Sequence, residues 1–482
     1  MATGGEVMTN FSTVIMREKS ASTKSPNSSV RNCYSLDVSP FGVRHRRRIS
    51  KEYFVRRRTL KDVLFKIFSK SEKFRKSTIA QSRNYQVEVE GDEHAVITEI
   101  KHVKDIKELP LELCLLENIQ ELHLSSNNIQ RLTHIEYCRN LRLLDVSQNK
   151  ILELEAGICS LKKLNTLNLN GNRLSTLPME IEKLYNLQHL FISANRLRSI
   201  PFGIKNIRTM QNLDLSRNRI DLIDEDFFEN LQYLECAVLS DNQLSRIPDS
   251  ILKCSNLKNL YLRKNRFKFV PASLCDVEKL ETLNISDNYI RKYNVSLRSL
   301  RKLFLGSNEL SDLSDSIADS VDLVTLSIEN NNFETFPRNV LKLSKLRNLN
   351  LSSNANLADI PSEINSLKNL RHLNLETTRT SCISRKLLTR SHLRLSVAGS
   401  LFSSEFQEMS DAGVEALKEF LASKNYQLPD LSNDIEDVGF GNDGNTNFDD
   451  NKDDTDVSDS EYVNDQYHDN VRCRQFSILK LS

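Results

Sequence analysis

The stretch "LNTLNLNGNRLSTLP", residues 164–178, threads Asn168, Asn170 and Asn172 through a leucine-rich pattern. Side chains of a β-strand point to opposite faces with a period of two, so the leucines of LxLxx face one way and Asn168 and Asn170 face the other. We expect Asn172 to turn inward and to hydrogen-bond backbone groups where the strand ends. The other two asparagines are expected on an exposed face, free to vary with a binding partner.

The same frame recurs eleven times along the chain, as in "LRLLDVSQNKI", "LNTLNLNGNRL" and "LQHLFISANRL". Neighbouring units are 20 to 24 residues apart. Their closing asparagines, which we call the asparagine ladder, are Asn127, Asn149, Asn172, Asn195, Asn218, Asn242, Asn265, Asn288, Asn308, Asn331 and Asn354. A twelfth unit, "LRHLNLETTRT", has Thr378 in that position. Self-similarity at this period predicts a stack of identical structural units.

Proline marks the second half of the unit. Seven of the ten prolines follow an apolar residue at the same place in the frame, as in Leu177-Pro178. Proline there fixes φ and starts a helical turn without losing a needed backbone donor. The following "xxIxxLxxL" pattern supplies apolar contacts for the side opposite the strands.

These residues resemble the leucine-rich repeat family, and the 23-residue form LxxLxLxxNxLxxLPxxIxxLxx is similar to its intracellular Ras-suppressor and Scribble class. The resemblance implies an α/β fold, a curved leucine-rich repeat solenoid with a parallel sheet on its concave side and helical or irregular turns on its convex side. The unit between Asn288 and Asn308 departs from the pattern because it is three residues short. Either the deletion is tolerated or it shapes a step in a binding surface.

Composition divides the rest of the chain. We expect a basic, largely disordered arm at 1–84, an N-terminal cap and degenerate repeat at 85–118, about twelve repeats at 119–400, a capping helix at 401–425 and an acidic disordered tail at 426–482. The repeat array needs caps because its end faces would otherwise expose apolar surface. In "SDAGVEALKEFLASK" the expected N-cap of the last helix is Ser410 or Asp411.

The arm is strongly cationic, with 14 basic and 3 acidic residues between Arg44 and Lys76. An amphipathic helix is expected near 59–70, because its apolar residues recur at helical spacing. Residues 44–76 suit an anionic membrane, a calmodulin-like groove or another protein. Phosphate contacts to nucleic acid are a further alternative, although nothing in the arm specifies bases. "KDVLF", at 61–65, also matches the loose docking pattern of type 1 phosphatase regulators, so a phosphatase-regulatory role is a third alternative.

The tail is as acidic as the arm is basic, with 14 acidic residues and 1 basic residue between Asp430 and Asp469. Opposite charge would let the tail fold back over the arm. Candidate phosphorylation sites are Ser50 and Thr59, which follow basic runs, and Ser458, which lies among carboxylates. Phosphate on the arm would cancel local positive charge.

No pattern in the sequence indicates an enzyme, a cofactor or a metal site. GxSxG and GxxxxGKS are absent, and the histidines do not form metal-ligand spacings. The single GxGxxG, "GFGNDG" at 439–444, has no strand before it and lies among acidic residues that would repel phosphate. The N-terminus lacks the apolar run of a signal peptide, so we expect a cytoplasmic monomer, with membrane association or nuclear localisation through the arm as alternatives.

The concave face is the expected binding surface. Outward strand positions, which lie six, four and two residues before each ladder asparagine, are mostly small or polar. Against that background stand Phe191, Val238, Tyr261, Arg263, Lys302 and Phe304. Exposed aromatic residues and arginine dominate the energetics of protein interfaces. The sequence therefore predicts a non-enzymatic scaffold or adaptor, active in intracellular signalling, that binds a protein partner through these residues.

Overall fold

The computed structural model describes residues 99–100, 107–109, 111–114, 119–388, 390, 392–413, 416 and 419. The chain divides into two compact units, residues 1–189 and 190–482, and each is described by itself. The predicted arm and acidic tail lie outside the described residues. Their helix near 59–70 and the candidate phosphorylation sites Ser50, Thr59 and Ser458 therefore remain predictions.

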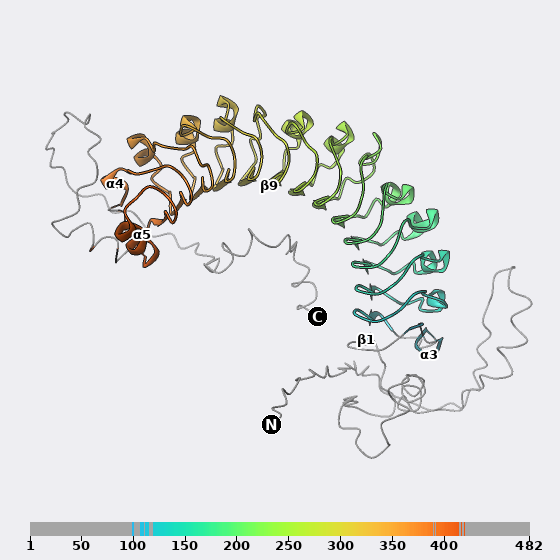
Figure 1. Cartoon of the computed structure of the whole chain (residues 1–482). Helices are drawn as coiled ribbons and strands as arrows, with labels where there is room; N and C mark the ends of the chain where they lie inside the picture. Colours follow the sequence, from blue (N-terminus) through green and yellow to red (C-terminus); the bar gives the residue numbers. More distant parts are fainter. Residues whose placement is uncertain are drawn as a thin grey trace, which may run out of the picture. The chain divides into compact units, whose positions relative to one another are not determined.

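The first unit alternates short strands with helical turns (Figure 1). Its elements are β1 (Glu99–Ile100), α3 (Leu111–Cys114), β2 (Glu121–His123), η1 (Ile135–Tyr137), β3 (Leu143–Asp145), η2 (Ala156–Ser160), β4 (Thr166–Asn168) and η3 (Met179–Lys183). The strands β1 to β4 pair in parallel and in chain order. Strand β5 (His189–Phe191) stands where the two units divide.

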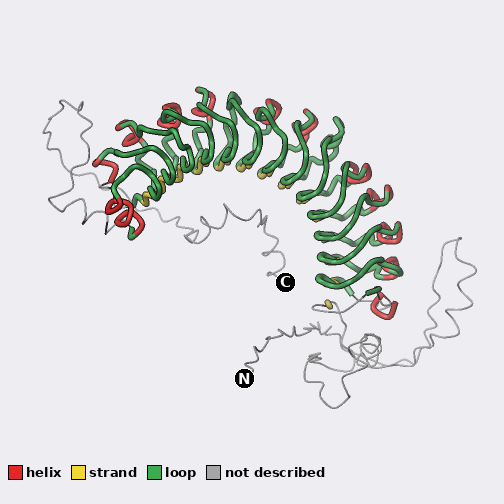
Figure 2. Tube along the Cα trace, viewed as in Figure 1, coloured by secondary structure: helices red, strands yellow, loops and turns green. Residues whose placement is uncertain are grey.

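The second unit continues the same alternation. Its elements are η4 (Phe202–Asn206), β6 (Asn212–Asp214), β7 (Cys236–Val238), η5 (Asp249–Lys253), β8 (Asn259–Tyr261), η6 (Ala272–Asp276), β9 (Thr282–Asn284), β10 (Lys302–Phe304), η7 (Asp315–Asp319), β11 (Thr325–Ser327), η8 (Arg338–Lys342), β12 (Asn348–Asn350), η9 (Ser362–Ser366), β13 (His372–Asn374), α4 (Arg385–Leu388), β14 (Arg394–Ser396) and α5 (Ser404–Asp411). Strands β6 to β14 each pair in parallel with the next. In Figure 2 these strands line the inner side of an arc and the helical turns line its outer side. We call the inner side the concave face.

The predicted fold class, a leucine-rich repeat solenoid with a parallel sheet, is confirmed. The sheet register places leucine against leucine, as in Leu260↔Leu283 and Leu283↔Leu303. Each of these three side chains is 0% exposed. Full burial of a leucine side chain contributes about 1.5–3 kcal/mol, so the stacked leucines form a continuous core in each unit.

Proline begins the helical turns, as its position in the frame predicts. In the second unit Pro201, Pro248, Pro271, Pro337 and Pro361 are the N-caps of η4, η5, η6, η8 and η9. Each turn is a five-residue 3₁₀ helix. A proline has no N–H to leave unsatisfied at a helix start, and its fixed φ suits the turn that follows.

The ladder asparagines tie each unit to the one before it. The Asn172 Nδ2 group donates to the carbonyl of Leu169 in its own unit and to that of Val146 in the preceding unit, both at 3.0 Å. Its Oδ1 atom accepts from the amide of Ile151 at 3.0 Å. All eleven ladder side chains are buried, at 0–9% exposure. Buried backbone groups would otherwise have no partner.

The twelfth unit shows how a shorter side chain fills the same position. Thr378 is 4% exposed, and its hydroxyl donates to the carbonyl of Leu375 at 2.7 Å. Threonine cannot offer the second donor and the separate acceptor of asparagine. This position therefore offers fewer side-chain hydrogen bonds than the asparagine positions of the preceding units.

Asn168 has a structural role in addition to its expected place on an exposed face. Its Oδ1 atom accepts from the backbone amide of Asn170 at 3.1 Å, which is an Asx turn at the end of the strand. The same contact is made by Asp145, Asp214, Asn284, Asn350 and Asn374. The outward asparagine thus also serves the fold, through one hydrogen bond rather than three.

The short unit lacks the convex helical turn. No helix lies between β9 and β10, and Tyr293 forms an isolated parallel bridge with Leu313 instead. Tyr293 is 1% exposed. Its large ring lies in the core at the place where most other units have a helical turn; the unit between β6 and β7 also has none.

The expected N-cap, Ser410 or Asp411, is wrong because both residues belong to the end of α5. Residues 416 and 419 are also helical, beyond the turn at Gly413, and the bounds of that later helix lie outside the described residues. Helix α5 begins after Ser403, whose hydroxyl caps it by accepting from the amide of Phe406 at 3.2 Å. Ser410 lies near the other end of α5, where its hydroxyl donates to the carbonyl of Leu395 in β14. Phe406, at 0% exposure, stacks on Phe402. Burial of these two rings stabilises the start of α5.

Replacing Asn172 by alanine should lower the free energy of unfolding by about 2–5 kcal/mol, because a buried amide and two carbonyls lose their partner. Asn168→Ala removes one hydrogen bond and should cost about 1 kcal/mol or less. Urea unfolding of both variants beside the wild type measures the difference. Equal losses for the two variants would contradict the distinction between ladder and outward positions.

Candidate functional site

The concave face of the second unit is a flat array of outward side chains held at fixed spacing. Neighbouring strands lie about 4.8 Å apart, and the parallel register places equivalent residues side by side. Tyr261 on β8 is aligned with Asn284 on β9, which is aligned in turn with Phe304 on β10. The two aromatic rings therefore flank a single asparagine.

Four of the six predicted residues gather on β8 and β10, the strands on either side of β9. Tyr261 and Arg263 come from β8 and the loop after it, and Lys302 and Phe304 come from β10. Lys302 is exposed, and the other three are half-buried. We call these four residues the concave cluster.

Two of the predicted residues are not exposed. Phe191 is 6% exposed and Val238 is 2% exposed. Val238 is aligned between Asp214 and Tyr261 on the neighbouring strands. The expectation of exposed side chains is therefore wrong for Phe191 and Val238, which add little surface to the concave face. Their assignment to a binding site stays an untested prediction.

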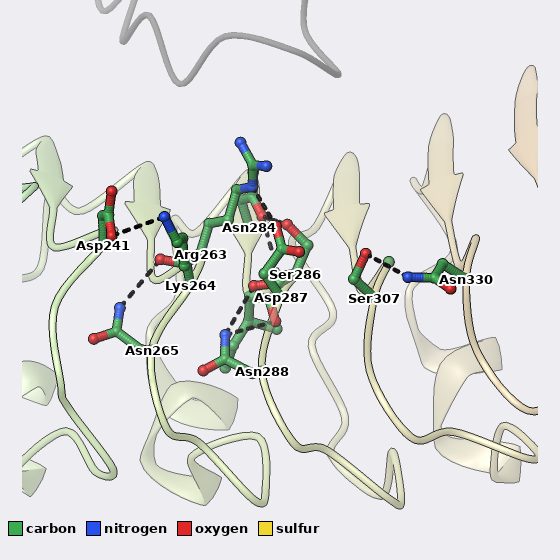
Figure 3. Close-up of polar contacts among 12 residues, drawn as sticks. Asp241, Arg263, Lys264, Asn265, Asn284, Ser286, Asp287, Asn288, Ser307 and Asn330 are labelled. Carbon is green, nitrogen blue, oxygen red and sulfur yellow. Dashed lines mark hydrogen bonds and ion pairs between the residues drawn. The ribbon is translucent and has the colours of Figure 1, made fainter.

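An ion pair orients the arginine of the concave cluster. Arg263 Nε donates to Asp287 Oδ2 at 2.5 Å, and both side chains are about one-third exposed (Figure 3). Below them the Asn284 Oδ1 atom accepts from the Ser286 amide and hydroxyl at 3.1 and 2.7 Å. Asn284 is therefore fixed between the two aromatic rings. A second pair, Lys264 with Asp241 at 3.2 Å, lies beside it on the loop before Asn265.

Glu329 gives the face a carboxylate that the sequence analysis missed. It lies two residues before Asn331. The equivalent position of the other repeats is mostly serine, so the glutamate is visible in the sequence as a departure from the repeat pattern. Its Oε2 atom accepts from the Ser327 hydroxyl and from Asn350 Nδ2. The carboxylate lies over Gly306, where an added Cβ would overlap it.

Burial raises the pKa of the Glu329 carboxyl, and the nearby Asp287 carboxylate raises it further. The hydrogen bond from Ser327 and the charge of Arg263 act in the opposite direction without cancelling the rise. The concave face thus has basic groups on β8 and β10 and a perturbed acid on the loop after β11. A protein partner would meet both signs of charge.

A shallow, open hollow of about 500 Å³ lies beside the short unit. Both signs of charge line it, and Lys345 pairs with Asp322 within it. The lining residues are Lys258, Glu278, Lys279, Glu281, Ser299, Arg301, Asp322, Val324 and Lys345. Its mixed and partly paired charges select no particular ligand.

Within the described part of the chain, no group of three or more His, Cys, Asp or Glu side chains is placed to hold a metal ion. Of the described helices, none has the length and hydropathy to cross a membrane.

Two family models match the chain. One describes a leucine-rich repeat region and covers residues 116–235, and the other describes a leucine rich repeat and covers 208–267, 237–290 and 255–310. Neither describes a catalytic family. A comparison with curated proteins gave no match.

Solved structures share the fold. A leucine-rich repeat protein of Leptospira interrogans is 31% identical, with a TM-score of 0.60, over 63% of this chain and 78% of that one. An internalin of Listeria monocytogenes, InlF, is 23% identical, with a TM-score of 0.55, over 63% of this chain and 86% of its own. At that identity the internalin supports the fold alone.

Glu329→Gln should remove a pH dependence of stability. Because the folded state holds the Glu329 proton to a higher pH than the unfolded state, wild-type stability should fall as the pH rises from about 4.5 through the raised pKa. A glutamine Oε1 atom can accept the same two hydrogen bonds without ionising. The stability of the variant relative to wild type should therefore increase with pH.

Thermal unfolding between pH 4 and 8 measures this difference. Glu334→Gln, at an exposed position in the same repeat, is the matched control and should keep the wild-type slope. Parallel curves for wild type and Glu329→Gln would show that the carboxylate does not titrate differently in the fold.

Proposed function

Because this chain belongs to the leucine-rich repeat family, we propose that it is a non-enzymatic scaffold or adaptor that binds a protein partner on the concave face of its second unit. The observation that carries the proposal is the concave cluster. Two aromatic residues, an arginine and a lysine lie there on β8 and β10, on either side of β9, on a face that is mostly small and polar.

The cluster is preorganised for binding. Arg263 is held by Asp287, and the Tyr261 and Phe304 backbones are fixed by the sheet on both sides. A rigid surface loses little conformational entropy when a partner binds, so more of the contact energy appears as affinity. Aromatic residues and arginine are also the side chains most enriched among interface hot spots.

The charges indicate the kind of partner. Arg263 and Lys302 favour an acidic group, and Tyr261 and Phe304 favour an apolar side chain between them. Glu329, on the next strand past Phe304, favours a basic or hydrogen-bond-donating group. We therefore propose a folded or extended protein segment with an apolar anchor flanked by charges of both signs.

The class and location of the protein belong to the same proposal. The 23-residue unit with proline at a fixed place supports the intracellular Ras-suppressor and Scribble type, a cytoplasmic location and a role in signal transduction. We propose that the chain acts as a monomer. Membrane, calmodulin-like, nucleic-acid and phosphatase-regulatory roles depend on residues 44–76, which lie outside the described residues, and they stay predictions.

The Tyr261→Ala/Phe304→Ala double variant should lower recovery of the partner at least tenfold in affinity capture from cell extract. Loss of one hot spot costs about 2 kcal/mol or more, which is close to thirtyfold in affinity. The matched control is Tyr233→Ala/Val321→Ala, which removes side chains that are 60% and 57% exposed on turns before β7 and β11.

A photoreactive phenylalanine analogue at position 304 locates the contact directly. It should crosslink to the protein that the wild type captures, whereas the same group at position 233 should not. Equal recovery by the double variant and the wild type, with crosslinks from position 233, would move the binding surface away from the concave face.

A further inference from the structure

A second surface lies at the edge of the sheet, where the chain leaves each strand. In four consecutive units the residues around the ladder asparagine are 194–199, 217–222, 241–246 and 264–269. These segments hold eight basic and two acidic residues, which gives 8 − 2 = +6. The same positions in the later segments 307–312 and 330–335 hold three acidic residues and no basic one. Positive charge is therefore concentrated at one part of the edge.

Six of the eight basic side chains are exposed and unpaired. Arg246 pairs with Glu225 at 2.7 Å and Lys264 pairs with Asp241 at 3.2 Å. The other six have no ion pair or side-chain hydrogen bond to any residue that the structure describes. They are Arg196, Arg198, Arg217, Arg219, Arg266 and Lys268, and we call them the basic edge.

The basic edge is held in register by the backbone. The amide of Arg219 donates to the carbonyl of Leu197 at 2.8 Å, and the amide of Arg266 donates to that of Leu244 at 2.7 Å. Between them the Gln243 amide donates to Ile220 at 2.8 Å. One row of equivalent positions therefore contains Arg196, Arg219, Gln243 and Arg266. Neighbouring positions in this row are about 4.8 Å apart.

Apolar side chains accompany the charge. Leu222 is 48% exposed, Phe269 is 65% exposed and Tyr289 is 52% exposed, and all three follow ladder asparagines on the same edge. An edge that combines an unpaired cationic column with exposed rings fits an extended anionic segment that carries its own apolar residues.

We propose that the basic edge binds the acidic segment 430–469 of the same chain. That segment has 14 acidic residues and 1 basic residue, and it contains Phe440, Phe448, Tyr462 and Tyr467 among the carboxylates. Its negative charge and its aromatic residues complement the cationic and apolar side chains of the edge. Single exposed ion pairs contribute little, but many of them acting along one segment add up and respond strongly to salt.

The length of the chain permits this contact. Strands β14 and β8 are six steps apart in the sheet, which is about 29 Å at 4.8 Å per step. Eleven residues separate Glu419 from Asp430, and an extended chain of that length spans up to about 36–40 Å. The acidic residues after Asp430 therefore lie within reach of the edge beside β6, β7 and β8.

Carbodiimide crosslinking of the full-length chain tests the proposal, because it joins lysine amines to carboxylates that are in contact. Lys264 and Lys268 should crosslink to carboxylates of 430–469 at low salt, and the yield should fall at least fivefold near 0.5 M salt, where the Debye length shortens to a few ångströms. This salt series needs only the wild type. An unchanged yield across the series would overturn the proposal.

Arg196→Glu/Arg219→Glu/Arg266→Glu keeps both reactive lysines and should lower their crosslinking to the segment at least fivefold. The control Lys253→Glu/Arg298→Glu/Lys368→Glu makes the same charge change at three exposed positions away from the edge and should leave the yield unchanged. Equal melting temperatures establish that both variants fold. Equal crosslinking by the two variants, or crosslinks from the segment to 44–76 alone, would contradict the proposal.

A mixture of ¹⁴N- and ¹⁵N-labelled chains distinguishes the source of the bound segment. Crosslinked peptides of one isotope only support contact within a chain, and peptides of mixed isotope would assign the segment to a second copy and overturn the proposal. The readout does not involve the partner of the concave face, so its failure would leave the proposed scaffold function standing.

Discussion

The structure depends on one side-chain amide per repeat. Nine of the eleven ladder asparagines bond both their own strand end and the strand end of the preceding unit, as Asn288 does through Ile285 and Leu262. Its Oδ1 atom also accepts from the amide of Phe267 in that preceding unit. Loops between parallel strands would otherwise bury unpaired backbone groups at every turn. The asparagine removes that cost and fixes the distance from one unit to the next, so it also sets the spacing of everything displayed on the sheet.

The geometry of the concave cluster and of the basic edge depends on this spacing between units. The alignment of β8, β9 and β10 brings the concave cluster together. The basic edge consists of residues in the segments around the ladder asparagines, which backbone hydrogen bonds hold beside one another. Neither surface needs a cavity or a catalytic group. Side chains at outward positions are free to differ between units because leucine and asparagine carry the fold. The array thus separates the buried residues that build it from the exposed residues that we propose as binding surfaces.

The repeat could be predicted from the sequence because identical short-range patterns recur, and each recurrence restates the same strand, turn and amide. The parts that could not be predicted depend on neighbours one unit away. Phe191 and Val238 are outward-facing, as alternation requires, yet they are buried at 6% and 2% exposure. Asn168 is held by the local amide of Asn170, and Ser410 and Asp411 lie at the end of α5, which begins at Ser404, beside the buried rings of Phe402 and Phe406. Glu329 was missed because its environment comes from Gly306 and Asn350 in adjacent units.

Hydrogen exchange at the Phe267 amide tests most directly whether the ladder holds the recognition face in place. This amide donates to Asn288 Oδ1 at 3.0 Å, and Asn288 follows the strand that separates β8 from β10. In Asn288→Ala the protection of Phe267 should fall at least tenfold, together with that of the amides around Arg263 and Asn284, while amides beyond β12 keep their wild-type rates. Unchanged exchange at Phe267 and across β8 to β10 would show that the strands hold their spacing without the asparagine, which would contradict the account.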